Sequence, residues 1–241
     1  MGIKICFPSF IILLQLCACN DLIHEKGNGN LISEEREVEG FSAIDLRGNY
    51  QIFLNQGSDP GLMIETDENL LELIETDVKD GVLRVENSKK ISSKKGVKIF
   101  ITFSSLDKIS SAGASVVKTE SLLEAQTLEV SLPGAGILDL QLEVQDLEIV
   151  VAGAGLVKLE GWAQHQEIKM SGIGNLEAYD MRSRTCNVTV TGVGSAQVNV
   201  SEALTASIKG MGGIKYKGNP ISVNESISGL GKIENADNDA I

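Results

Sequence analysis

Ser131-Leu-Pro-Gly134-Ala-Gly136-Ile-Leu138 and Val150-Val-Ala-Gly153-Ala-Gly155-Leu-Val157 are two copies of one phrase that recurs through the second half of the chain. Each copy sets a Gly-x-Gly triplet between segments in which apolar residues alternate with other residues. Copies follow one another at intervals of about 18 to 21 residues, and a fixed period in that range is typical of solenoids. A degenerate copy, Gly113-Ala-Ser115, precedes six full ones, whose glycines are Gly134 and Gly136, Gly153 and Gly155, Gly172 and Gly174, Gly192 and Gly194, Gly210 and Gly212, and Gly229 and Gly231.

The spacing around each triplet indicates two strands per copy. Before Gly134, apolar residues stand at alternate positions in Leu128, Val130 and Leu132, and after it in Leu138 and Leu140. Alternate residues of a strand share a face, so these residues face a core. Stacking such rungs about 4.8 Å apart predicts an all-β parallel solenoid, roughly 30 to 40 Å long, with rungs of about 19 residues.

The middle residue of every triplet is apolar, which suggests that the chain does not run straight through the glycines. We therefore expect a corner or bulge at each triplet, where glycine adopts dihedral angles closed to other residues and the central side chain turns inward. The glycines then have a structural role and do not form a ligand loop. The central residues are Ala114, Ala135, Ala154, Ile173, Val193, Met211 and Leu230.

The residues before the array predict a first rung and an insertion. If Gly48 is aligned with the first glycine of the repeat, Ile44, Leu46, Ile52 and Leu54 fall on the apolar positions. An insertion from about 55 to 103 then separates this rung from the array. We expect strands there and one short helix that begins at a capping Asp67 and continues to Val78. This insertion is expected to cover one open end of the solenoid.

The N-terminus has the pattern of a lipoprotein signal. Lys4 is followed by an apolar segment, Ile5–Leu16, that is too short for a membrane span. The sequence Leu16-Cys17-Ala18-Cys19 resembles a bacterial lipobox and predicts signal peptide 1–18 and a lipid on Cys19. The alternative is an ordinary secretory signal. We further expect a flexible tether over 19–37, the solenoid domain over 38–233 and an acidic tail over 234–241.

Composition narrows the functional classes. The formal net charge of -12 and the absence of a basic stripe argue against nucleic acid as a partner. His24 and His165 are the two histidines of the sequence, so no histidine-based metal site or triad is expected, and no cofactor. Trp162 and His165, expected in a loop, are an alternative sugar-stacking pair. Cys186 falls on an apolar position and is expected in the core.

The chain also resembles a known family, the putative auto-transporter adhesin head GIN domain family. The resemblance covers about 38–233 and rests on Gly40-Phe41-Ser-Ala-Ile-Asp-Leu46, Tyr50-Gln-Ile-Phe-Leu-Asn-Gln-Gly57, Ile64-Glu-Thr-Asp67, Asp80-Gly81-Val-Leu and the Gly-x-Gly array. It implies a right-handed, single-stranded β-helix-like solenoid in a cell-envelope protein of the kind found in Bacteroidota. It implies no catalytic residues.

These observations predict a lipid-anchored envelope protein, expected at the outer membrane, with an adhesive or structural binding role. Its expected partners are the membrane, through the anchor, and a protein or glycan. The alternatives are a carbohydrate-active enzyme and an envelope-stress or assembly accessory protein. An enzyme would need paired carboxylates, whereas the acids of the array alternate with core residues, as on a solvated strand face. These acids are Glu129, Glu143, Glu148, Glu160, Glu167 and Glu177.

Overall fold

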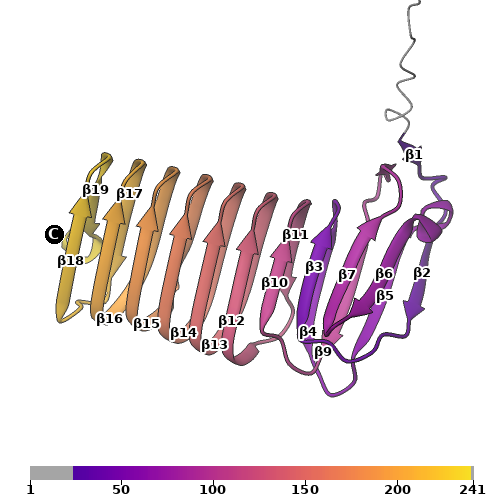
Figure 1. Ribbon diagram of the computed structural model, residues 1–241, viewed down its shortest axis with the longest axis horizontal. Coiled ribbons are helices and arrows are strands. Elements are labelled where there is room, and N and C mark those ends of the chain that lie inside the picture. Colours follow the sequence, from indigo (N-terminus) through magenta and orange to yellow (C-terminus); the bar gives the residue numbers. More distant parts are fainter. Residues whose placement is uncertain (1–23, 240–241) are drawn as a thin grey trace, which may run out of the picture.

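A computed structural model describes residues 24–239 of the chain. These residues form a β-solenoid of about 7 turns with rungs about 19 residues apart. Figure 1 shows the rungs side by side in one row, with the C-terminal strands at one end and the N-terminal strands at the other. The predicted fold class, an all-β parallel solenoid, is confirmed.

Each rung of the array continues in parallel register onto the next. For example, Gly136 pairs with Gly155, and Gly155 with Gly174, so that equivalent residues stack in columns along the solenoid. The strands of the array are β12 (Leu123–Leu132), β13 (Ala135–Val151), β14 (Ala154–Met170), β15 (Ile173–Val190), β16 (Val193–Ile208), β17 (Met211–Lys217), β18 (Ser222–Ile227) and β19 (Leu230–Asn235).

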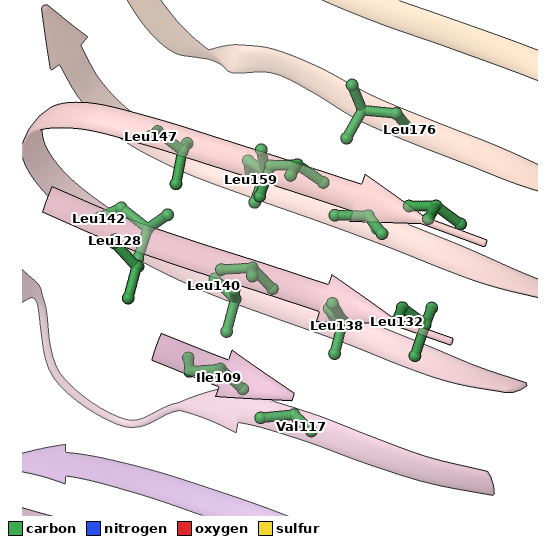
Figure 2. Close-up of a cluster of buried hydrophobic side chains, with 14 of the residues drawn as sticks. Ile109, Val117, Leu128, Leu132, Leu138, Leu140, Leu142, Leu147, Leu159 and Leu176 are labelled. Atoms are coloured by element: carbon green, nitrogen blue, oxygen red, sulfur yellow. The ribbon is translucent and has the colours of Figure 1, made fainter. Parts of the chain in front are cut away.

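The long strands β13–β16 bend twice per rung. One bend lies at the Gly-x-Gly triplet, and we call it the glycine corner. The other lies midway, where Val144 and Leu147 are both buried and the two residues between them are exposed. Figure 2 shows leucine side chains of successive rungs filling the interior, such as Leu128 with Leu147 and Leu140 with Leu159. Between the two bends, buried and exposed residues alternate. The buried side chains of successive rungs therefore form one continuous aliphatic core.

The predicted first rung is present. It consists of β3 (Ala43–Arg47) and β4 (Gln51–Gln56), which stack on β10 (Lys108–Ser111) and β11 (Ala114–Thr119) of the array. The insertion folds to the other side of this rung. There, β7 (Val82–Asn87) and β9 (Lys98–Phe103) add a further parallel layer on β3 and β4. Ile44 and Ile52 are consequently buried between two layers.

Antiparallel strands complete the N-terminal cap. β5 (Gly61–Asp67) pairs with β9, β2 (Leu31–Arg36) with β5, and β6 (Ile74–Lys79) with β7. A separate small pair joins β1 (Glu25–Lys26) to β8 (Ile91–Ser92). The expectation of a flexible tether over 19–37 is therefore wrong for β1 and β2, which pair with strands of the cap.

Two local predictions need correction. The expected helix after Asp67 is a 3-10 helix, η1 (Glu68–Leu73), and the residues after it form β6. Asp67 makes no side-chain cap; its carboxylate instead accepts a hydrogen bond of 2.6 Å from the N–H of Gly29. At the other terminus, the expected tail contains the end of β19 and a second 3-10 helix, η2 (Ala236–Asp239).

The glycine corner also differs from the prediction. The chain bends there, but the central side chain points outward: Ile173 is 65% exposed and Leu230 is 73% exposed. The expectation that each corner needs dihedral angles closed to other residues is wrong as well. Among the paired glycines, Gly136 (158°) and Gly212 (153°) have positive φ angles that other residues rarely adopt. The left-handed region is not used by the other paired glycines, which are Gly134, Gly153, Gly155, Gly172, Gly174, Gly192, Gly194, Gly210, Gly229 and Gly231.

Glycine is required at these corners for another reason, which is the close approach of successive rungs. The carbonyl oxygen of Gly134 accepts a hydrogen bond of 3.0 Å from the N–H of Ala154 in the next rung. A Cβ atom on Gly153 would overlap with this same oxygen. The hydrogen bond that joins the rungs therefore leaves no room for a side chain on the first glycine of the triplet.

The second glycine of each triplet meets a carbonyl group in the same way. A Cβ on it would overlap with the carbonyl oxygen of its equivalent one rung earlier, as at Gly155 above Gly136. The same overlap arises for Gly194 above Gly174, for Gly212 above Gly194 and for Gly231 above Gly212. Backbone contact between rungs therefore restricts both glycine columns, and the dihedral angle adds to this restriction at Gly136 and Gly212.

Candidate binding groove

The midway bends of successive rungs form a shallow groove of about 670 Å³ on the side of the solenoid. It crosses five consecutive rungs and reaches Asp107 of the rung before them, and three neighbouring positions of a rung contribute to it. Two outward columns supply its polar groups. The first contains Thr127, Asp146, His165, Thr185 and Ala203, and the second contains Glu129, Glu148, Glu167, Asn187 and Thr205.

Lysines neutralise the acids of the second column. Lys169 contacts Glu148 at 2.9 Å and Glu167 at 2.8 Å, and Lys108 contacts Glu129 at 2.8 Å. The hydrogen bonds to both glutamates raise the pKa of Lys169 above its ordinary value. These acids are therefore held in ion pairs on an exposed strand face, and each such pair contributes little to stability.

The first column is less strongly paired. The Nδ1 atom of His165 lies 2.7 Å from the Oγ1 atom of Thr185, so these two side chains form one hydrogen-bonded unit across adjacent rungs. Asp146 stands beside His165 in the preceding rung. All three are at least partly exposed, which leaves hydroxyl, imidazole and carboxylate groups facing a ligand in the groove.

An inward column lies beneath these groups and contributes to the lining. It contains Leu128, Leu147, Gln166, Cys186 and Leu204. Cys186 is buried, as its apolar position predicted, and burial raises the pKa of its thiol to about 12. The thiol is thus kept neutral and unreactive. Gln166, which was not predicted as a site residue, is 3% exposed, and its amide has no hydrogen-bond partner among the described residues.

The structure separates the predicted site residues. His165 lines the groove, but it lies within β14, as does Trp162, so the loop expected around them does not exist. Trp162 does not line the groove. The paired glycines lie at the opposite corner of each rung, away from the groove. Cys19 and the predicted signal peptide lie outside the described residues. Asp146 and Thr185 were not predicted, although column alignment with His165 would have found them.

A second surface runs along the glycine corner. The outward central residues form a line of side chains that is apolar in all seven copies and bulky in the last four, which are Ile173, Val193, Met211 and Leu230. We call these four residues the apolar ridge. Contiguous exposed apolar residues are unusual on a monomeric protein surface and mark contact sites. The ridge and the groove therefore lie on opposite corners of one scaffold.

The residues described here hold no group of three or more histidine, cysteine or acidic side chains that is arranged to bind a metal. Nor does any described helix have the length and apolar character needed to cross a membrane. The fold and the groove together define a capped β-solenoid with a shallow, open surface site.

The comparisons with known proteins agree with this class. A family model described as "Putative auto-transporter adhesin, head GIN domain" matches residues 40–220, and the chain belongs to this family. The earlier resemblance is thereby confirmed. No curated protein matches the chain.

Several solved structures share this fold. A putative adhesin from Bacteroides fragilis is 33% identical, with a TM-score of 0.83 over 87% of this chain and 99% of that one. A putative adhesin from Parabacteroides merdae is 25% identical, with a TM-score of 0.67 over 88% and 99%. A protein from Parabacteroides distasonis, described as a putative lipid binding protein, is 20% identical with a TM-score of 0.72 over 89% and 100%, and shares the fold.

Proposed function

We propose that this protein is a lipid-anchored envelope protein that uses the groove to bind an extended glycan or polypeptide. The observation that carries the proposal is the repetition of polar groups along the groove, one set per rung. A ligand with its own repeating units can contact several rungs at once, and weak contacts then add up to useful affinity. Membership of a family of adhesins supports a role at the cell surface or in the envelope.

The groove has the mixed lining that binding sites require. Ligand sites combine an apolar floor with a few polar groups that fix orientation. Here the buried Leu128 and Leu147 lie beneath the groove as its apolar floor, while Asp146, His165 and Thr185 supply hydrogen-bonding groups at the rim. The open, shallow shape suits the side of a polymer chain better than a small enclosed molecule.

We further propose that binding is not coupled to catalysis. Glycoside hydrolysis uses two carboxyl groups on opposite sides of one bond, with one of them kept protonated. In the groove, Glu148 and Glu167 share Lys169, and Glu129 pairs with Lys108. Each of these three carboxylates thus contacts a lysine ammonium group, and no two of them face each other as a free pair of carboxyl groups. Release of reducing sugars from a bound glycan would contradict this part of the proposal.

The binding proposal can be tested with the chain from residue 20 onward on a glycan array and in pull-down assays with envelope extracts. A double variant, Asp146→Ala with His165→Ala, removes two neighbouring groups of the groove. A matched control, Glu143→Ala with Lys158→Ala, removes one acidic and one basic side chain from exposed positions outside it. We expect at least a tenfold loss of binding in the groove variant alone. Equal binding by both variants would contradict the assignment.

The lipid anchor rests on the sequence around Cys19 and needs a separate experiment. Cells that express the full chain are grown with labelled palmitate. We expect the label on the wild-type chain and none on a Cys19→Ala variant. Label on the variant would contradict the anchor without affecting the groove.

A further inference from the structure

At the C-terminal end of the solenoid, the helix η2 covers the half formed by β17 and β19 and leaves the half formed by β18 uncovered by any other described element. Among the described residues, β18 pairs with β16 and β19 pairs with β17, and neither has a strand on its other edge. Over the β17 and β19 half, η2 folds back, and the N–H of Gly218 donates a hydrogen bond of 3.0 Å to Asp237. Ile233 is buried there. Over the other half, β18 is the last described strand, at the end of the row in Figure 1.

Core positions are therefore exposed on β18. Its register on β16 places Val223 on Leu204 and Ile227 on Ile208, and both partners in β16 are fully buried. Val223 is nevertheless 39% exposed and Ile227 is 48% exposed, because no other strand of residues 24–239 covers them. An edge strand with uncovered core side chains is a template for pairing with another strand.

A charged residue, Glu225, lies between these two apolar residues on the same face of β18. Glu225 pairs with Ala206, whose side chain is buried in the core. The position of Glu225 is thus an inward one, and its negative charge, second to burial, raises the pKa of Tyr216 in β17. Lys215 in β17 and Lys232 in β19 both contact Glu234 instead.

These features define what kind of strand can complete the end. We infer that β18 is a docking edge for an extended segment of a partner protein with the pattern apolar–x–basic–x–apolar. Its two apolar side chains would cover Val223 and Ile227, and its lysine or arginine would face Glu225. Backbone hydrogen bonds would extend the sheet by one strand, and opposite charges facing each other across two strands stabilise the pairing.

A second copy of this chain does not fit the same edge. No Lys or Arg of the sequence has apolar residues at both the second position before it and the second position after it. The exposed charged residues of the strands at the opposite end of the solenoid are mostly acidic: Glu34 and Glu35 in β2 and Glu75 and Asp77 in β6, against one exposed lysine, Lys79 in β6. End-to-end contacts between copies would therefore bring Glu225 near like charges, which is unfavourable.

The test uses the full-length chain and two fluorescent peptides, Thr-Val-Thr-Lys-Thr-Val-Thr and the same peptide with glutamate in place of lysine. We expect fluorescence anisotropy to show the lysine peptide binding about tenfold more tightly. A Glu225→Lys variant should reverse this preference. A control variant, Glu177→Lys, makes the same change at an exposed residue within the array and should keep the wild-type preference.

Three results of the peptide experiment would overturn the inference. These are the absence of binding by either peptide at millimolar concentration, equal binding by both, and an unchanged preference in a folded Glu225→Lys variant. Sedimentation velocity at neutral pH adds a further arm: a dimer of the wild-type chain that Ile227→Lys dissociates would make a second copy the occupant and contradict the assignment. None of these results depends on ligand binding in the groove.

Discussion

The backbone N–H of Ile173 donates a hydrogen bond of 2.9 Å to the carbonyl oxygen of Gly153, one rung earlier. A Cβ atom on the intervening Gly172 would overlap with the same oxygen. Rung stacking and the choice of glycine are therefore two consequences of one contact. The side chain of Ile173, in turn, points away from the core because the backbone of this corner packs directly on the corner below.

The outward orientation of Ile173 predicts that alanine substitution of two isoleucines in neighbouring strands changes the free energy of unfolding by very different amounts. Ile173→Ala removes a side chain that is mostly in solvent and should change the free energy of unfolding by about 0.5 kcal/mol or less. Ile168→Ala removes one that is fully buried and should cost about 2 to 5 kcal/mol. Urea unfolding followed by circular dichroism measures both. A large cost at Ile173 would restore the inward arrangement of the corner.

The buried amide of Gln166 predicts a stabilising substitution. Its column otherwise holds leucine and cysteine, and neither amide atom has a partner among the described residues. An unsatisfied buried polar group costs about 1 to 3 kcal/mol. Gln166→Leu should therefore raise the midpoint of thermal unfolding, while Gln164→Leu, at a half-buried position two residues earlier, should leave it nearly unchanged. A lower midpoint for Gln166→Leu would mean that the amide is satisfied in solution.

The buried thiol of Cys186 predicts slow reaction with thiol reagents and a specific dependence of stability on pH. Burial raises the pKa of the thiol from 9.0 to about 12. In the chain from residue 20 onward, where Cys186 is the one cysteine of the sequence, Ellman's reagent at pH 8 should therefore label the unfolded protein and not the native one. A neutral thiol in the folded state favours folding below pH 9, and this contribution is lost as pH rises from 9 towards 12. Over that range wild type should lose stability more steeply than Cys186→Ala. Parallel curves for the two proteins would contradict the prediction.

The sequence was most informative where structure repeats. The Gly-x-Gly period and the constant offsets of residues such as Leu128 and Leu138 predicted parallel rungs, because a residue in a stacked rung contacts its own equivalent. The alignment of Gly48 with Gly113 was also correct, since a Cβ on Gly113 would overlap with the carbonyl of Gly48. A single repeat unit therefore determines most of the fold.

Other features depended on contacts that no local pattern encodes. β7 stacks on β3 across a separation of about 39 residues, and β2 joins the cap through β5, so a polar segment that reads as a tether becomes a strand. The direction of the Ile173 side chain depends on the distance between backbones at the corner. Apolar character alone suggested burial and was misleading there.

The candidate site was hidden for a similar reason. Asp146, His165 and Thr185 are about 20 residues apart in the sequence and inconspicuous one at a time. They form a site because the register places them in one column. In a solenoid, residues at the same position of successive rungs therefore form a site, although they are far apart in the sequence.

The central claim is that the glycines are required by the contact between rungs, and Gly172→Ala tests it most directly. A matched control is Gly61→Ala in β5, where an added Cβ would meet no atom within 4 Å. Urea unfolding should show a loss of about 3 kcal/mol or more for Gly172→Ala, because a Cβ forces two backbones apart. Gly61→Ala should be neutral or slightly stabilising. Equal stability of the two variants would contradict the claim.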